Sequence, residues 1–236
     1  MPQSLHIWIT GAGRGIGAAI AKHLGGRHRI TLSGRTESTL QQVAEQLPSQ
    51  NAFTAPCDVT DPQSVSAAHA SAVGHFGTVD VLINNAGIGV FKDLAEMSLE
   101  EFDAQIAVNL RGVFLCAKAV LPQMIERERG MIVTINSVAA ISAFSGCSGY
   151  GASKAGALAL TRSLRQEVRD SHVKVTDILV GATETEIWAQ EDRDTNGARM
   201  MQAQDVADAV QMLVASYDNP RTHFEEILIR PQRGDL

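Results

Sequence analysis

The sequence predicts an α/β domain built on a doubly wound parallel sheet of about seven strands, with helices on both faces. Short β-rich runs alternate with longer helical patterns along residues 1–236, which indicates repeated βαβ units. Val81-Leu82-Ile83 is a continuous apolar run, as expected of a strand buried on both faces. A glycine-rich turn directly follows the first strand. No linker, internal repeat or low-complexity tract interrupts the pattern, so we expect one domain over residues 1–236.

The strands are expected where apolar and β-branched residues are concentrated. Leu5, Ile7 and Ile9 open the first strand, and the others cover residues 30–33, 52–56, 79–84, 131–136, 173–180 and 227–229. The run at 52–56 is the weakest of these. Longer patterns between the strands predict helices over residues 15–24, 37–47, 62–76, 99–129, 149–170 and 204–216.

Residues 182–203 do not fit the alternation. This segment is rich in charged residues, contains Trp188, and follows the carboxyl end of the 173–180 strand. Ligands of open α/β sheets bind at such ends, and long loops are usually functional. We therefore expect a substrate loop here, with an ordinary solvated loop as the alternative.

The composition excludes several classes of protein. The formal net charge is −6 and the isoelectric point about 5.6, whereas nucleic-acid binding usually needs a basic face. The three cysteines form no CxxC pair and have no histidine at metal spacing, so we expect reduced thiols and no metal site. The sequence begins without a leader pattern, and no apolar run approaches the roughly 20 residues of a membrane span. These features predict a cytoplasmic protein without a membrane partner.

The turn after the first strand is typical of a phosphate-binding site. It reads Thr10-Gly11-Ala12-Gly13-Arg14-Gly15-Ile16-Gly17 and leads into a helix. Glycines permit the sharp turn and the close approach of the backbone to a pyrophosphate, and the positive end of the helix faces the phosphates. The turn therefore predicts a dinucleotide site.

The spacing of this turn resembles that of the classical short-chain dehydrogenase/reductase family, and the resemblance extends over nearly the whole chain. Two further matches are Asp58-Val59, whose aspartate contacts adenine in the family, and Asn85-Ala86-Gly87 after the fourth expected strand. The resemblance implies a Rossmann-type fold that binds NAD(P)(H).

The second expected strand favours NADP(H). NAD-selective sites place an acidic residue there for the ribose 2′-hydroxyl, whereas an arginine accommodates the 2′-phosphate. Here the strand ends in Ser33-Gly34-Arg35, and Arg14 lies in the glycine-rich turn. A guanidinium binds phosphate through paired charge-assisted hydrogen bonds, so both arginines predict contacts with the 2′-phosphate.

A catalytic group is expected at Ser137, Tyr150 and Lys154. Residues four apart share one face of a helix, so Tyr150 and Lys154 project together. Free tyrosine has a pKa near 10, and a neighbouring ammonium is expected to lower it toward neutrality. The family resemblance implies that Tyr150 exchanges the proton, Lys154 also holds the nicotinamide ribose, Ser137 binds the substrate oxygen, and Asn109 kinks its helix and anchors a water relay to the lysine.

The resemblance also implies a role for the turn after the 173–180 strand. The family usually has Pro-Gly there, but this chain has Val180-Gly181, followed by Thr183 and by Thr185, which matches the residue that holds the nicotinamide carboxamide. Without the proline, φ is less restricted and we expect a less rigid loop. The substrate pocket is expected at Ser137, Ala139, Cys147 and Tyr150, with Val90, Ala140 and Ile141 also near it.

These features predict an NADP(H)-dependent reductase of ketones or aldehydes, with 3-oxoacyl compounds among the candidate substrates. The alternatives are an alcohol dehydrogenase working in the oxidative direction, a non-catalytic NADP(H)-binding regulator, and a sugar-nucleotide epimerase or dehydratase. Family members commonly associate through the helices at 99–129 and 149–170, which predicts a homodimer or homotetramer.

Overall fold

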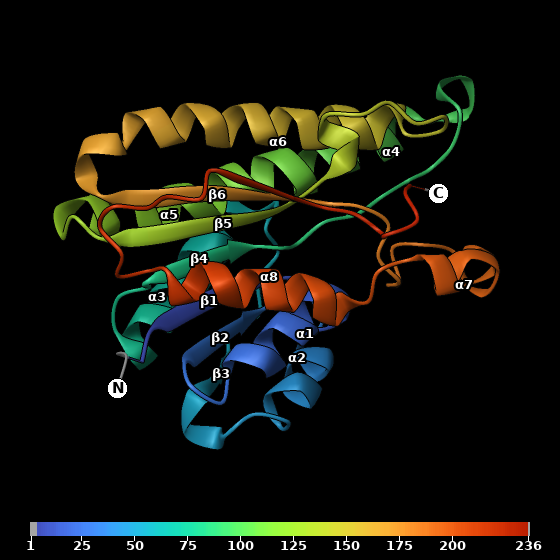
Figure 1. Cartoon of the computed structure of the whole chain (residues 1–236). Coiled ribbons are helices and arrows are strands. Elements are labelled where there is room, and N and C mark those ends of the chain that lie inside the picture. The colour runs from blue at the N-terminus through green and yellow to red at the C-terminus, as the bar shows by residue number, and fades with distance from the viewer. Residues whose placement is uncertain (1–3, 236) are drawn as a thin grey trace.

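A sheet of seven parallel strands forms the centre of the computed structural model, which describes residues 4–235 (Figure 1). The strand order is β3-β2-β1-β4-β5-β6-β7. The order reverses between β1 and β4, which is the switch point where doubly wound sheets bind ligands. The predicted fold class is therefore confirmed. The expectation that the sequence begins without a leader pattern concerns residues 1–3, which lie outside the described residues.

Most elements lie where the sequence predicts them. The strands are β1 (His6–Thr10), β2 (Arg29–Ser33), β3 (Ala52–Thr54), β4 (Val81–Asn84), β5 (Gly130–Ser137), β6 (Val173–Val180) and β7 (Glu226–Ile229). The α-helices are α1 (Gly15–Leu24), α2 (Glu37–Ala44), α3 (Pro62–Phe76), α4 (Leu99–Ile106), α5 (Gly112–Glu126), α6 (Ser148–Glu167), α7 (Gln190–Asn196) and α8 (Ala203–Ala215).

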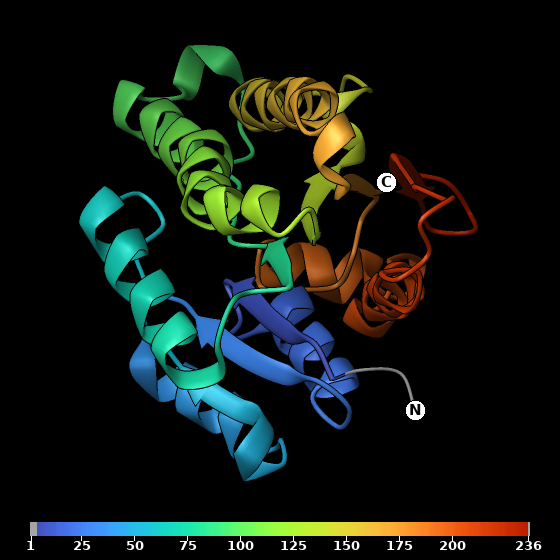
Figure 2. The same ribbon diagram turned by 90° about the vertical axis from the view of Figure 1, so that its left-hand side faces the viewer.

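Helices cover both faces of the sheet and form three layers (Figure 2). On one face, α1, α2 and α8 pack over Ile7, Ile9 and Ile30. On the other face, α3, α5 and α6 pack over Trp8 and Leu82. Adjacent residues of one strand thus face opposite layers, which explains why the strands are continuously apolar.

The structure differs from the sequence prediction in two helical regions. The helix expected over residues 99–129 is a run of α4, a π-helical segment η3 (Ala107–Arg111) and α5, and it ends at Glu126. The expected loop at 182–203 contains α7 and a short 3-10 turn, η6 (Gly197–Arg199). α7 was not predicted because its residues are polar or charged and show no apolar periodicity.

The helical run Leu99–Glu126 is long and apolar enough to cross a membrane by length and composition alone, so the sequence analysis underestimated this run. In the structure, Cys116, Ala117, Val120 and Met124 of α5 pack into the core between α3 and α6. This packing accounts for the apolar composition of the helix, because a core helix and a membrane helix meet the same criterion.

The carboxyl ends of the strands meet several loops and the end of the chain. α7 and the carboxyl terminus both lie on the right of Figure 1, beyond the ends of β5 and β6. Parallel β-strands bring all these connections to one edge of the sheet. Residues far apart in the sequence therefore gather there.

Candidate active site

A cleft of about 810 Å³ lies at this edge of the sheet. Most residues predicted for the cofactor, the substrate and catalysis line it, namely Gly11, Gly13, Arg14, Gly15, Ile16, Arg35, Asp58, Val59, Asn85, Ala86, Gly87, Ser137, Ala139, Cys147, Tyr150, Lys154, Gly181, Thr183 and Thr185. The predicted residues that do not line it are Gly17, Asn109, Val90, Ala140 and Ile141. Ile141 directly follows the 3-10 turn η4 (Val138–Ala140) and is 48% exposed.

The glycine-rich turn is shaped by close contacts with the chain around it. Gly11 has a φ of +65°, and a Cβ there would lie 2.8 Å from the Cα of Ala86. Gly17 lies behind the turn, where a Cβ would approach the carbonyl oxygen of Gly11 to 2.3 Å. Gly17 therefore lets α1 pack against the turn, while Gly11 forms the surface of the cleft.

The motif after β4 fixes the turn by hydrogen bonds. The Asn85 side chain donates to the carbonyl oxygens of Thr10 and Gly11, both at 3.0 Å. The backbone N–H groups of Asn85 and Ala86 both donate to the Thr10 hydroxyl, at 3.1 Å. The ends of β1 and β4 are thus joined on either side of the switch point, and the cleft floor is pre-formed.

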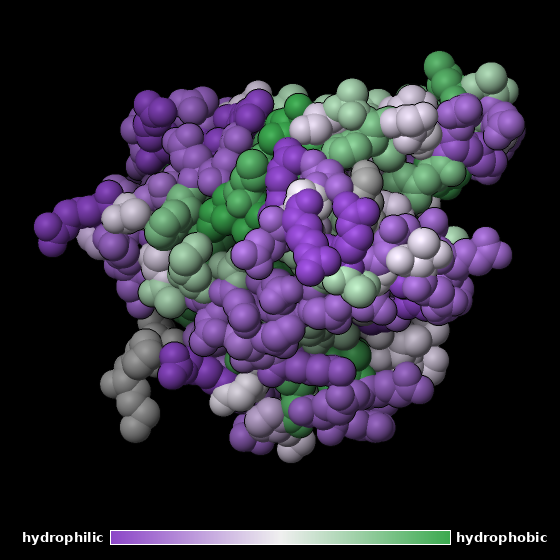
Figure 3. All heavy atoms as spheres, turned by 45° about the vertical axis from the view of Figure 1, so that its right-hand side comes forward, coloured by the Kyte–Doolittle hydropathy of each residue, from purple (hydrophilic) through white to green (hydrophobic). Residues whose placement is uncertain are grey.

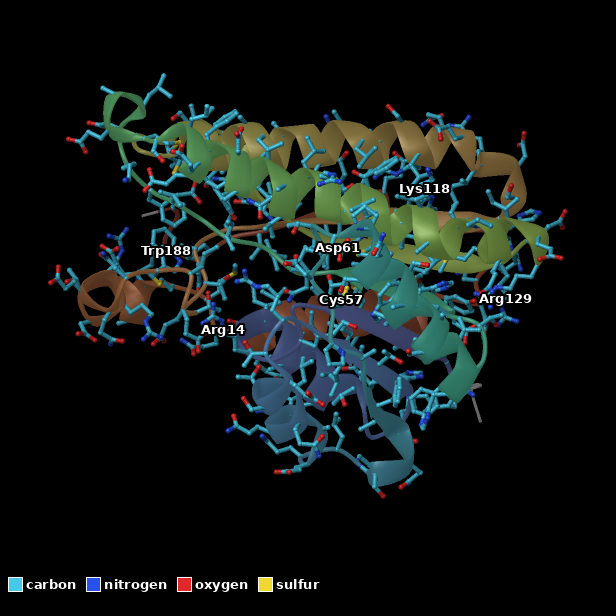
Figure 4. The ribbon with its side chains drawn as sticks, turned by 180° about the vertical axis from the view of Figure 1, so that it is seen from behind. Arg14, Cys57, Asp61, Lys118, Arg129 and Trp188 are labelled. Carbon is cyan, nitrogen blue, oxygen red and sulfur yellow. The ribbon has the colours of Figure 1, made fainter. Side chains whose placement is uncertain are left out.

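The two predicted arginines lie at the same cleft. Arg14 precedes α1, on the side of the molecule that carries α7 and Trp188 (Figure 4). Arg35 follows β2 and helps to hold the pKa of Asp58 below its usual range. The larger cause of that lowered pKa is the pair of hydrogen bonds that the Asp58 carboxylate accepts from the backbone N–H and hydroxyl of Thr60. This end of the cleft combines a fixed carboxylate with two guanidinium groups.

Tyr150 and Lys154 lie on α6, beside the end of β5. The Lys154 ammonium donates to the carbonyl oxygen of Ile135 at 3.0 Å and lies 5.8 Å from the centre of the Tyr150 ring. Ser137 is the last residue of β5, and its hydroxyl accepts from the N–H of Ala139 at 3.1 Å. The three predicted catalytic side chains are therefore close together in the cleft.

The expectation that Lys154 lowers the pKa of Tyr150 toward neutrality is wrong for the protein chain on its own. Burial raises the pKa of Tyr150 to about 12, although contact with the Ser137 hydroxyl partly opposes this. Burial also lowers the pKa of Lys154 to about 8, with Asp177 acting in the opposite direction. Desolvation disfavours the charged form of each group, and it is the largest cause of both shifts.

Asn109 lies in the π-helical segment η3 and is buried. Its side-chain oxygen accepts from the N–H of Ile88 at 2.9 Å, and its amide donates to the carbonyl of Ile88 at 2.8 Å and to the Ser153 hydroxyl at 2.9 Å. A π-bulge interrupts the regular helical ladder, in agreement with the expected distortion at Asn109. This residue joins three chain segments behind the cleft.

The turn after β6 is held firmly despite lacking the proline. Gly181 donates to the carbonyl of Ile229 at 2.8 Å, and a Cβ on Gly181 would lie 2.9 Å from Cδ of Pro231. The ends of the following segment are paired as well, because Met201 donates to Ala182 at 2.9 Å and Glu184 donates to Met201 at 2.8 Å. Tertiary hydrogen bonds thus replace the restriction on φ that proline would supply.

Several residues of the cleft were not predicted from the sequence. Phe91 lies close to Tyr150, Phe144 lies in the loop after β5, and Asp235 reaches the cleft from the carboxyl-terminal segment. Trp188 was expected only as part of a loop. The rarity of aromatic residues, with 7 Phe, 2 Trp and 2 Tyr in the chain, is the one sequence signal that distinguishes Phe91 and Trp188.

Comparison with known proteins decides the family. The model of the short chain dehydrogenase family matches residues 5–196. The chain belongs to the short-chain dehydrogenase/reductase family. This confirms the resemblance on which the predicted roles of the site residues depend.

Individual relatives of this short-chain dehydrogenase/reductase cover nearly its whole length. A sepiapterin reductase of Chlorobaculum tepidum is 36% identical over 97% of this chain and 96% of its own. The structure of an alcohol dehydrogenase from Thermococcus sibiricus, complexed with 5-hydroxy-NADP, is similar with a TM-score of 0.87 and 29% identity over 98% of this chain and 97% of the other. That of a 3-ketoacyl-(acyl-carrier-protein) reductase from Brucella melitensis, complexed with NADH, has a TM-score of 0.89 and 27% identity over 98% of both chains.

Proposed function

We propose that this short-chain dehydrogenase/reductase uses NADPH to reduce a ketone or aldehyde to an alcohol, with Tyr150 as the proton donor. The observation that carries the proposal is the arrangement of Tyr150, Ser137 and Lys154 in one cleft with the glycine-rich turn. When bound, the cofactor supplies the hydride.

The cleft fits a dinucleotide with a 2′-phosphate. The glycine-rich turn offers backbone N–H groups and the start of α1 to a pyrophosphate, and Gly11 leaves no room for a side chain beside Ala86. Arg14 and Arg35 would hold the 2′-phosphate, and Asp58-Val59 would border the adenine. Lys154, Thr183 and Thr185 line the part of the cleft that would hold the nicotinamide half.

The polar side chains at Tyr150 are suited to reduction. Burial raises the pKa of Tyr150 to about 12, so the phenol is protonated at neutral pH, which is the form that a proton donor needs. The Ser137 hydroxyl would donate to the substrate oxygen, where negative charge develops as the carbonyl is reduced. The Lys154 ammonium would favour the phenolate that remains after proton transfer, because opposite charges attract strongly in a partly desolvated site.

The relatives support the class of reaction and leave the substrate open. The names sepiapterin reductase and 3-ketoacyl-(acyl-carrier-protein) reductase both describe reductases, but of very different substrates. An oxidative dehydrogenase remains the alternative, supported by the alcohol dehydrogenase among the similar structures.

We also propose a homo-oligomer in the cytoplasm. Phe114 is 45% exposed on α5, on the outer side of the helices that commonly form family interfaces. The surface in Figure 3 is largely hydrophilic, with hydrophobic atoms in smaller areas between. Gly156 of α6 packs within the chain, because a Cβ on it would lie 3.0 Å from Leu110. Sedimentation velocity at micromolar concentration measures the assembly, and a 25.2 kDa species would contradict it.

The function is tested by following NADPH oxidation at 340 nm with a panel of ketones and aldehydes. Tyr150→Phe should lower kcat by about 10²- to 10⁴-fold, because the proton donor is lost while the ring is retained. Tyr217→Phe is the matched control, because Tyr217 is the other tyrosine and does not line the cleft. Full activity of Tyr150→Phe would contradict the assigned role.

A further inference from the structure

Three aromatic rings from distant parts of the chain meet in the cleft. The rings of Phe91 and Trp188 are stacked, with centres 5.1 Å apart and an interplanar angle of 16°. The ring of Phe91 also meets Tyr150 edge-on, at 5.3 Å and 67°. Phe91 follows β4, Trp188 precedes α7, and Tyr150 lies on α6. A flat aromatic surface thus begins directly beside the proposed proton donor.

Both segments that carry this surface are held in place. The N–H of Lys92, next to Phe91, donates to the carbonyl of Gly146 at 2.9 Å, which joins this segment to the loop before α6. Trp188 donates its backbone N–H to the carbonyl of Thr185 at 3.2 Å within its own segment, and Glu184 of that segment donates to the carbonyl of Met201 at 2.8 Å. Backbone hydrogen bonds therefore hold the segments that carry both rings at the cleft.

Apolar side chains line the cleft together with this pair. Ile187, Phe144 and Ala139 line the same cleft. Phe91 and Trp188 do not belong to the two buried clusters on the faces of the sheet. Core packing therefore does not account for these two large side chains, which are only half-buried.

We propose that Phe91 and Trp188 form the substrate-selecting wall of the enzyme and that its substrates carry an aromatic or heteroaromatic ring next to the carbonyl. A flat ring gains contact area and favourable ring geometry against such a surface, whereas a puckered or linear chain loses part of both. The edge-on contact between Phe91 and Tyr150 would direct a carbonyl attached to the bound ring toward the phenol. This inference rests on the proposed carbonyl reduction and adds the class of substrate.

A matched pair of ketones tests the inference. Acetophenone and cyclohexyl methyl ketone have the same number of carbon atoms and the same acetyl group, but only the first has a flat ring. Phe91→Leu and Trp188→Leu keep an apolar side chain and remove the aromatic surface. We expect each variant to lower the ratio of kcat/KM for acetophenone to kcat/KM for cyclohexyl methyl ketone by about tenfold, because offset ring contacts contribute on that order.

Comparing ratios removes the intrinsic difference in reactivity between the two ketones. Phe114→Leu is the matched control, since Phe114 is exposed on α5 and does not line the cleft. Its ratio should equal that of the wild type. An unchanged ratio in both Phe91→Leu and Trp188→Leu would overturn the inference.

A binding measurement separates this inference from the proposed function. Ligand-observed NMR with NADP and each ketone reports binding whether or not turnover occurs. Preferential binding of acetophenone that is lost in Trp188→Leu supports the aromatic wall even if the wild type oxidises no NADPH. Equal binding of the two ketones by the wild type would overturn the wall while leaving carbonyl reduction intact.

Discussion

Replacing Lys154 by methionine should stabilise the protein at neutral pH while removing its activity. Lys154 is only 7% exposed, and its folded pKa is about 8 against an ordinary value of 10.5. The unfolded chain therefore binds more protons than the folded chain between these two pH values. The charge on Lys154 destabilises the fold most below pH 8, and the penalty fades as the pH rises toward 10.5.

The magnitude follows from the shift in pKa. At about 1.36 kcal/mol per pKa unit, the penalty is about 3 kcal/mol at pH 7 and about 1 kcal/mol at pH 9.5. Methionine fills similar space without charge, but it leaves the carbonyl of Ile135 without its donor, which costs about 1–2 kcal/mol. We expect the free energy of unfolding of Lys154→Met to exceed that of the wild type by about 1–2 kcal/mol at pH 7. At pH 9.5 this difference should be about 2 kcal/mol lower.

Urea unfolding followed by circular dichroism at pH 7 and pH 9.5 measures both quantities. Lys22→Met makes the same exchange at an exposed position of α1, and its free energy of unfolding should stay near that of the wild type. The hydrogen-bond cost is the same at both pH values and cancels in the comparison. A difference between Lys154→Met and wild type that does not change with pH would refute the assigned burial penalty.

Three further substitutions test other parts of the site. Arg35→Ser should raise KM for NADPH at least about tenfold and leave KM for NADH nearly unchanged, because only NADPH carries the 2′-phosphate; equal effects on the two cofactors would contradict the assignment. Asn109→Ala should lower the free energy of unfolding by about 2 kcal/mol or more, since Ile88 loses two hydrogen bonds, and urea titration measures the loss. Gly17→Ala should lower the melting temperature and raise Kd for NADPH together, because the new Cβ would approach the Gly11 carbonyl to 2.3 Å. A melting temperature equal to that of the wild type would contradict this, because it would show that α1 shifts freely.

Local patterns were sufficient to predict the sheet and most of the helices. A strand buried on both faces has to be continuously apolar, as β4 and β6 are, and this pattern survives in the sequence whatever surrounds it. The 3-10 and π segments were not predicted. Their hydrogen-bond registers depend on contacts such as those of Asn109 with Ile88, which lies 21 residues away.

The loop after β6 shows the same limit. Val180 in place of proline suggested a mobile turn, but Gly181 pairs with Ile229 and its Cα faces Pro231. Those partners come from the end of the chain. The residues of the turn alone do not show which distant segment packs against it.

The fold class, the family and the spacing that puts Tyr150 and Lys154 on one helical face could be predicted from the sequence, because each depends on residues close together in the chain. The pKa shifts of these two residues and the aromatic wall beside them could be found only in the folded chain. Burial, which raises the pKa of Tyr150 and lowers that of Lys154, is a property of the whole folded chain. The contact of Phe91 with Trp188 likewise exists only because parallel strands deliver both segments to the same edge of the sheet.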